Sequence, residues 1–247
     1  MKKAIGTLVA FFCTVVGVFA QTKTVNVDAF EKIIISPHIE VELVQGAKES
    51  VLIENAKISL DKINIEVEGN TLRIYLDGAK TVTKSERVSN DNWKGKKSIY
   101  NGTMATTKIT YKTIKNLSIR GEEIVEVKSP MDQEKLKLAI YGESKVYFDG
   151  LTLDDLTVAI YGESYLEIAD GKVERQVYRA YGESEVNTLE MGNTETKITA
   201  YGESNFRVQV SDHLKVTCYG ETTINYDGNP DVDSGIIIGE AKVRKIG

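Results

Sequence analysis

Apolar and polar residues alternate along the C-terminal half of the chain, on both sides of a recurring glycine. One clear segment has Leu136, Leu138 and Ile140 before Gly142, then Val146 and Phe148 after it. A period of two is typical of a β-strand, whose successive side chains point to opposite faces. The pattern predicts two strands joined by a corner at the glycine. Later segments keep the same positions, with Leu156, Val158, Ile160, Leu166 and Ile168 in the next one.

The corner belongs to an internal repeat. Tyr-Gly-Glu begins at Tyr141, Tyr161, Tyr181, Tyr201 and Tyr219, in steps of 20, 20, 20 and 18 residues. Degenerate copies stand before it as Arg120-Gly121-Glu122 and after it as Ile238-Gly239-Glu240. A fixed period of this size indicates a solenoid, in which each repeat is one structural unit stacked on the next.

The repeat composition selects the kind of solenoid. The units are rich in Val, Ile, Tyr and Thr, which favour strands, and lack the leucine-asparagine pattern and helical segment of leucine-rich repeats. Turn signals follow the strands at Asp149-Gly150, Asp170-Gly171 and Asp227-Gly228. We therefore expect an all-β protein, a single-stranded parallel β-helix with coils of about 20 residues. It should be right-handed, as nearly all parallel crossovers are.

The glycine and the serine that follows it have physical roles at such a corner. A tight corner needs a residue that tolerates positive φ or has no side chain to clash with the next coil. The serines share the inward parity, and a small hydroxyl can bond a backbone group freed by the corner. They are Ser144, Ser164, Ser184 and Ser204, with Thr222 in the next repeat.

The N-terminal half also contains strand patterns but lacks the marker. We predict irregular N-terminal coils over 21–117 and regular coils over 118–247, with a separate β-sandwich as the alternative for the former. The polar stretch 79–107 is predicted to be an insertion loop that projects from the coil. Long loops in compact domains are often functional. Trp93 within it is a candidate binding residue, although a tryptophan that packs the loop onto the body is the simpler interpretation.

The first 20 residues are predicted to be a secretory signal peptide. Lys2 and Lys3 precede an apolar run over 4–19, and cleavage is expected before Gln21. A retained membrane anchor is the alternative, but the run is short for a bilayer. The mature chain has no second such run, so we expect no membrane span in it. We expect export to the periplasm, the outer surface or the medium.

Charge and side-chain chemistry narrow the function. The formal net charge of −5 becomes −7 without Lys2 and Lys3, which argues against nucleic acid as a partner. Cys218 is the one cysteine left after cleavage and shares a core column with Ile140, so no internal disulfide is expected. The two histidines, His38 and His213, are expected on the surface. No zinc, phosphate-loop or nucleophile motif is present, and we predict that the protein is not an enzyme.

The candidate site lies on the outside of the corners. By strand parity the tyrosines point outward in one row, where rings about 4.8 Å apart can stack. Such a row is a plausible platform for sugar rings or peptides. The candidate binding residues are Tyr141, Tyr161, Tyr181, Tyr201 and Tyr219, with Trp93.

A row of glutamates runs beside the tyrosines. Carboxylates at this spacing repel one another, so the side chains should splay into solvent, pair with basic residues or bind a cation. Duplication of a solvent-facing residue is the simplest explanation. Calcium is the one cofactor considered, because it favours carboxylate oxygens. The candidate metal ligands are Glu143, Glu163, Glu183, Glu203 and Glu221, within a row that also holds Glu122 and Glu240.

The signal peptide, the opening alternating strands and the string of small-Gly-polar-Ser units resemble the putative auto-transporter adhesin head (GIN) domain proteins of bacteria. The resemblance spans residues 23 to 247, and its best motif is Tyr141-Gly142-Glu143-Ser144 with its copies. Ser-Gly-Ser-Gly-like elements are common there in the family, so Tyr and Glu are this protein's variation. The resemblance implies an exported β-helical protein with an adhesive or surface role, and no catalytic residues.

Three functions compete at this point. The first is an adhesin-like binding or structural protein whose tyrosine and glutamate rows engage a glycan or a surface protein. The second is a polysaccharide-cleaving enzyme, since many parallel β-helices cleave acidic glycans. Its site would need clustered carboxylates rather than a regular line. The third is a self-assembling envelope protein, in which Lys242, Arg244 and Lys245 protect an open strand edge.

Overall fold

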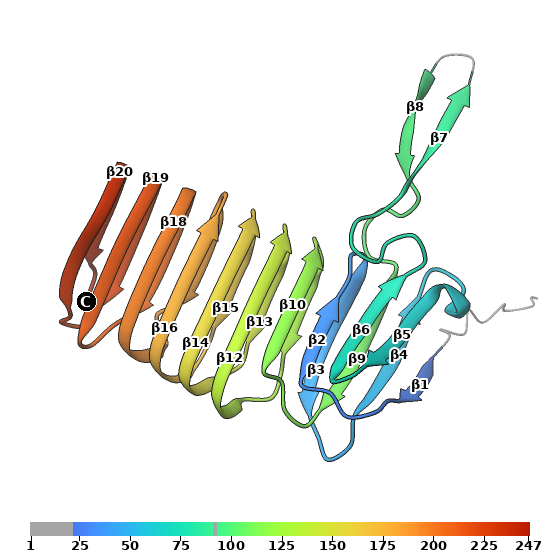
Figure 1. Cartoon of the computed structure of the whole chain (residues 1–247), viewed down its shortest axis with the longest axis horizontal. Coiled ribbons are helices and arrows are strands. Elements are labelled where there is room, and N and C mark those ends of the chain that lie inside the picture. The colour runs from blue at the N-terminus through green and yellow to red at the C-terminus, as the bar shows by residue number, and fades with distance from the viewer. Residues whose placement is uncertain (1–21, 91–92) are drawn as a thin grey trace, which may run out of the picture.

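The strands of the protein stack side by side into one elongated body (Figure 1). The computed structural model describes residues 22–90 and 93–247, and eighteen of their strands form one continuous sheet. The signal peptide predicted over 1–20 lies outside the described residues.

The regular half begins at residue 116, and every coil of it contains one glycine corner, the site of the Tyr-Gly-Glu motif or its degenerate copy. In the last three coils the corner lies inside one continuous strand. The strands are β10 (Asn116–Gly121), β11 (Ile124–Val127), β12 (Met131–Gly142), β13 (Lys145–Phe148), β14 (Leu151–Gly162), β15 (Tyr165–Ile168), β16 (Gly171–Tyr181), β17 (Ser184–Thr188), β18 (Met191–Gln209), β19 (His213–Asp227) and β20 (Asp231–Lys245).

Each coil lies parallel to the next with the register that the repeat predicts. In β12 and β14, Leu138 pairs with Val158 and Tyr141 pairs with Tyr161. In β18 and β19, Tyr201 pairs with Tyr219 across the shorter step. The predicted all-β parallel solenoid with coils of about 20 residues is therefore confirmed. Its right-handedness stays a prediction.

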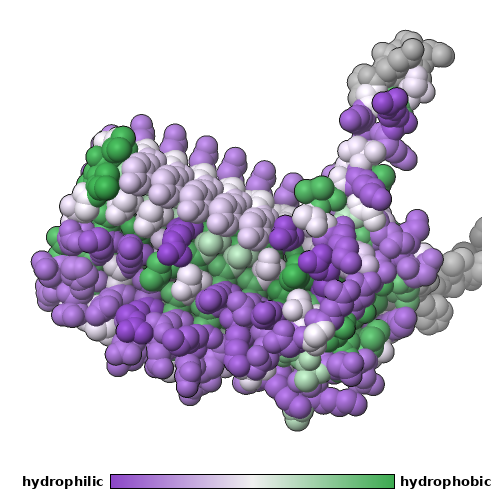
Figure 2. Space-filling view, in the orientation of Figure 1, coloured by the Kyte–Doolittle hydropathy of each residue, from purple (hydrophilic) through white to green (hydrophobic). Residues whose placement is uncertain are grey.

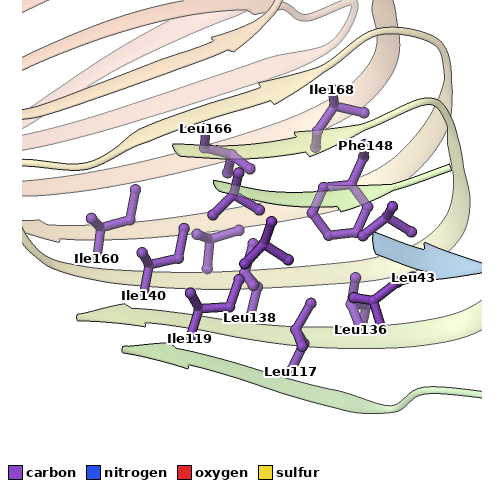
Figure 3. Close-up of a cluster of buried hydrophobic side chains, with 14 of the residues drawn as sticks. Leu43, Leu117, Ile119, Leu136, Leu138, Ile140, Phe148, Ile160, Leu166 and Ile168 are labelled. Carbon is purple, nitrogen blue, oxygen red and sulfur yellow. The ribbon is translucent and has the colours of Figure 1, made fainter. Parts of the chain in front are cut away.

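A coil of the regular half has three sides around an apolar interior. Pairing of β12 with β14 is interrupted at Glu134 and ends at Gly142, which separates the sides 131–133, 135–142 and 145–148. Figure 3 shows the stacked apolar side chains that fill the space between the sides. The labelled ones are Leu43, Leu117, Ile119, Leu136, Leu138, Ile140, Phe148, Ile160, Leu166 and Ile168.

The corners bring the backbones of successive coils into direct contact. Gly162 has φ +124°, and a Cβ built on it would lie 2.2 Å from the carbonyl oxygen of Gly142 in the coil before. That same oxygen accepts hydrogen bonds from the Glu163 amide at 2.9 Å and the Ser164 hydroxyl at 3.0 Å. The roles predicted for glycine and serine are both confirmed at this corner.

The N-terminal half joins the same sheet, but its coils are not stacked in sequence order. β2 (Lys32–Ile35) and β3 (Ile39–Gln45) lie between two other coils. On one side are β10 and β11, and on the other are β6 (Thr71–Leu76) and β9 (Ala105–Tyr111). The first coil of the chain, β2 and β3, therefore lies between the second coil, β6 and β9, and the third, β10 and β11. The chain crosses from one side of the first coil to the other before the regular stack begins. The domain boundary predicted at 117 falls inside this continuous sheet.

The remaining N-terminal strands are not coils, which corrects the prediction for them. They run antiparallel and close the end of the stack, β5 on β6 and β1 on β4 on β9. Alternating sequence could not reveal this, because alternation is the same in either direction. The strands are β1 (Lys23–Asn26), β4 (Ser50–Ala56) and β5 (Ile63–Glu68), with a 3₁₀ turn η1 (Leu60–Lys62). Among the described residues no helix is long and apolar enough to span a membrane.

The insertion projects from the body but is not a loop throughout. It contains the antiparallel hairpin of β7 (Ser85–Asn90) and β8 (Trp93–Ser98), which extends away from the stack in Figure 1. Residues 105–107, predicted to belong to the loop, are the first part of β9 and pair with β3. The polar composition of 85–98 concealed the hairpin, whose described side chains at 85–89 and 95–98 lie outside the apolar core.

Two buried tyrosines differ in how their hydroxyls are satisfied. The Tyr178 hydroxyl donates to Gln176 Oε1 at 2.8 Å, and Gln176 Nε2 donates to Thr196 at 2.9 Å. The Tyr111 ring is also buried, but its hydroxyl has no hydrogen-bond partner among the described residues. Burial raises the pKa of Tyr111 to about 12.

Gly162→Ala should lower the free energy of unfolding by at least about 2 kcal/mol, because the new Cβ meets a backbone carbonyl that cannot move aside. Gly69→Ala is the matched control. Gly69 also has positive φ, but no atom lies within 4 Å of a Cβ there. It should cost only about 1 kcal/mol of strain. Urea unfolding compares the two, and equal losses would contradict a coil-to-coil contact requirement.

Tyr111→Phe should keep or raise stability at neutral pH, by up to about 1 kcal/mol, because it removes a buried hydroxyl without a partner. Tyr178→Phe should destabilise, since it leaves Gln176 unpaired. As pH rises from about 10, unfolded Tyr111 loses a proton that the folded chain keeps to about 12, so wild-type stability falls there. Tyr111→Phe should reduce that fall, as measured by urea titration at each pH. A large loss at neutral pH would show that the hydroxyl is satisfied.

Candidate functional site

The five tyrosines of the repeat form one continuous stack. Successive ring centroids lie 5.0, 4.8, 4.9 and 4.7 Å apart, and the ring planes differ by 1–4°. We call these residues the tyrosine row: Tyr141, Tyr161, Tyr181, Tyr201 and Tyr219. The regular corner produces this spacing, because each tyrosine directly precedes a glycine that contacts the glycine of the next coil.

Stacking decides which part of each ring a partner could reach. The faces of the inner rings lie against neighbouring rings, so ring edges and hydroxyls form the outer surface. At one end the Arg120 guanidinium lies 4.6 Å from the centre of the Tyr141 ring, a cation–π contact. At the other end Ile238 takes the tyrosine position beside Tyr219. The row therefore offers an array of hydroxyls rather than a set of open ring faces.

The seven glutamates after the corner glycines form a second row, the glutamate row. The outward parity predicted for it is found, since Glu143, Glu163, Glu183, Glu203 and Glu221 are all exposed. Figure 2 shows a line of hydrophilic side chains running beside a paler line along this edge of the body. Within the described part of the chain, an ion pair reaches only Glu240 of the row, from Lys242 at 2.9 Å. Splaying into solvent is therefore the main arrangement.

The glutamate row borders a shallow hollow on the side after the corner. Its walls include Lys145, Tyr165, Glu185 and Asn205. Each of these residues follows the glutamate of its own coil by two positions and also points outward. No group of three or more His, Cys, Asp or Glu among the described residues is arranged to hold a metal ion. The geometry thus gives a line of separate carboxylates, and calcium binding by them stays a prediction.

Trp93 is not part of this face. It is the first residue of β8 in the projecting hairpin, and its side chain lies outside the described residues. Its suggested binding role also stays a prediction. Cys218 is fully buried, as its column predicts, with its sulfur 3.2 Å from the Thr222 hydroxyl.

His38 anchors the base of the insertion, a role that sequence reasoning missed. Its side chain is 14% exposed, so this histidine is partly buried at the surface rather than free in solvent. One ring nitrogen bonds the Gly102 carbonyl at 2.8 Å and the other the Thr83 hydroxyl at 2.6 Å. His38 has φ +72°, which few non-glycine residues adopt. The preceding Pro37 is the one local signal of an unusual turn.

A second acidic surface lies at the bend before residue 135. Asp132, Glu134, Asp154 and Glu174 line a hollow there, with Lys172 among them. Sequence reasoning missed it because these residues recur at the bend rather than beside a conspicuous motif. It lies on another side of the coil from the tyrosine row.

Comparison with known proteins gives a consistent result. A family profile described as "Putative auto-transporter adhesin, head GIN domain" matches residues 29–230. A putative adhesin from Bacteroides fragilis has a similar structure, with a TM-score of 0.74 and 18% identity over 92% of this chain and 96% of that one.

A protein called a putative lipid binding protein, from Parabacteroides distasonis, has a TM-score of 0.67 at 19% identity, with the same coverage of 92% and 96%. A putative adhesin from Parabacteroides merdae has a TM-score of 0.66 at 18% identity, again over 92% and 96%. These identities establish a shared fold alone. No curated protein sequence matches the chain.

The tyrosine row should stabilise the fold through pairwise ring contacts. In a double-mutant cycle with leucine, Tyr161 and Tyr181 should show a coupling of about 0.5–1.5 kcal/mol in the free energy of unfolding. Tyr141 and Tyr201, which have two rings between them, are the control pair and should show coupling near zero. Urea titrations of the single and double variants supply the values. Equal coupling in both pairs would mean that the rings do not act through contact.

Proposed function

The chain belongs to the family described as putative auto-transporter adhesin, head GIN domain. From this premise we propose that the protein is a non-catalytic, adhesin-like binding protein of the cell envelope or surface. Its body is a rigid support, and its working surface is the corner that carries the tyrosine and glutamate rows. The partner is a glycan or a protein that lies along several coils at once.

The observation that carries the proposal is the continuity of the tyrosine row. Five phenolic hydroxyls project at the spacing of the coils, from rings that hold one another in place. Tyr161 and Tyr201 are 41% and 38% exposed. Rigid aromatic side chains lose little conformational entropy on binding, which is why they are frequent in recognition surfaces. A ligand with repeated polar groups can meet several of these hydroxyls together.

The glutamate row selects the charge of the partner. An acidic polysaccharide would meet a line of carboxylates with no described ion pair except at Glu240, and like charges at an interface cost binding energy. A neutral or cationic glycan, or a basic protein segment, would be favoured. Salt should weaken the binding of a cationic partner, because exposed charges are screened.

Replacement of Tyr161, Tyr181 and Tyr201 by Ala should abolish glycan binding in an array of oligosaccharides. The array holds neutral manno-oligosaccharides, cationic chito-oligosaccharides and acidic alginate oligosaccharides. Wild type should bind neutral or cationic members, and the control variant Tyr147→Ala should bind as wild type does. Tyr147 also faces outward, but it lies after the corner and does not line the hollow beside the glutamate row. Binding of acidic members alone, or unchanged binding by the triple variant, would contradict the proposal.

Glu163→Gln, Glu183→Gln and Glu203→Gln together should separate charge from shape. This variant should lose salt-sensitive binding of cationic members while it retains binding of neutral ones. Its thermal unfolding temperature should rise at low salt, since the repulsion within the row is reduced, and the rise should shrink at high salt. An unchanged affinity for cationic members would exclude the glutamate row from binding.

A further inference from the structure

The C-terminal end of the stack is open and apolar. In the described part of the chain, β20 pairs with β19 and with no other strand, so one edge of its backbone is unpaired. Ile236, Ile237, Ile238 and Ile246 are 58%, 40%, 61% and 50% exposed. Figure 2 shows the corresponding hydrophobic patch at the end of the body where β20 lies. A long strand edge with exposed large apolar residues favours pairing with another chain.

The inward part of the patch is exposed because no described coil lies above the last one. Ile237 lies over Cys218 in the inward column, and Val243 lies over Ile224. Cys218 and Ile224 are fully buried, whereas Ile237 is not. A further coil stacked on β20 would therefore bury Ile237 as the equivalent residues of the previous coils are buried. Among the described residues no segment covers this side of β20, and a second copy of the chain offers a strand of the same length and shape.

The charges of β20 are divided between its two halves. Residues 231–238 before the corner carry Asp231 and Asp233. After the corner, Glu240 is paired with Lys242, and Arg244 and Lys245 leave this half with a net charge of +2. A second β20 in antiparallel orientation would set each acidic half opposite a basic half. A parallel copy would set like charges opposite each other. The charges of β20 are thus complementary to those of a second, antiparallel β20.

The corner fixes the centre of such a pairing. β20 turns at Gly239, which has φ +111°, so two copies can pair along both halves only if their corners coincide. Gly235 and Ile236 form a bulge opposite Thr217, which shifts the register of this half by one residue. Reversal about Gly239 therefore sets Asp233 opposite Arg244 of the second copy, and both lie in outward columns. Asp233 bonds Lys215 of its own chain at 2.5 Å, and both side chains are about 40% exposed, so the carboxylate can face a second cation.

The other end of the stack does not offer a matching surface. There β5 lies antiparallel on the last coil, and β4 and the four-residue β1 cover its other side. Parallel head-to-tail stacking would need a free coil at that end. Association through β20 is therefore closed by two-fold symmetry at two copies.

We propose that a second copy of this chain covers β20, with the two β20 strands antiparallel about Gly239 in a two-fold dimer. Ile237 and Ile246 become buried at the junction. The corners of both copies face the same side, so the tyrosine row of each continues into the glutamate row of the other. The dimer does not depend on the function of these rows.

Sedimentation velocity and light scattering of the full chain over a wide concentration series test the proposal. Wild type should pass from one chain to two as concentration rises and go no further. Ile237→Lys should remain monomeric with an unchanged circular dichroism spectrum. Ile124→Lys is the matched control, because Ile124 is 39% exposed but lies on β11 in the regular body, away from β20, and it should dimerise like wild type.

A charge exchange tests the orientation of the strands. Asp233→Arg and Arg244→Asp should each weaken dimerisation several-fold, and the two together should restore it, because each changed residue then faces its changed partner. A wild type that stays monomeric at every concentration, open-ended larger assemblies, or a double variant weaker than both single ones would overturn the proposal.

Discussion

The contact between glycine corners of successive coils is the constraint on which the regular half depends. One carbonyl, that of Gly142, receives both the amide of Glu163 and the hydroxyl of Ser164 from the next coil. A side chain on Gly162 would occupy the same space. The serine hydroxyl reaches the corresponding glycine carbonyl in three other coils, at 2.9 Å, 3.3 Å and 3.4 Å. The corner is therefore a fixed position in every coil, and each residue near it lies directly over the equivalent residue of the coil before.

The alignment of equivalent residues in successive coils stabilises one of the two rows beside the glycine corner and destabilises the other. Stacked aromatic rings gain about 0.5–1.5 kcal/mol per pair, so the tyrosine row stabilises the register that created it. Like charges at strand spacing repel, and water and salt reduce this cost without changing its sign. The glutamate side chains form no described hydrogen bond or ion pair apart from Glu240 with Lys242. The tyrosines thus have a structural reason for their position, whereas the glutamates have none in packing, which directs attention to their effect on a partner.

The regular half was predictable because its repeat length equals the length of one coil. Tyr141 fixes the position of Tyr161, and parity then fixes which neighbours point inward, including Cys218. The N-terminal half was not predictable to the same degree. Nothing in Ile63–Val67 or Ser50–Ala56 distinguishes an antiparallel strand from a parallel one, and the insertion of β2 and β3 between later coils leaves no sequence period. His38 was missed for a related reason, since its partners Thr83 and Gly102 are remote in the sequence.

A solenoid has no natural length, so its two ends must each be finished by something other than another repeat. At the N-terminal end the finishing strands run against the coil direction, and their outer edges are short or polar, as in β1 with Lys23 and Thr24 or β5 with Asn64 and Glu66. Short and charged edges are the usual protection against further pairing. The C-terminal strand has 15 residues and places three consecutive isoleucines where the tyrosine row ends. Apart from Glu240, its charged residues lie at either side of this apolar centre. The proposed dimer therefore assigns Lys242, Arg244 and Lys245 a different role from general edge protection, since they favour one orientation of a second strand over the other.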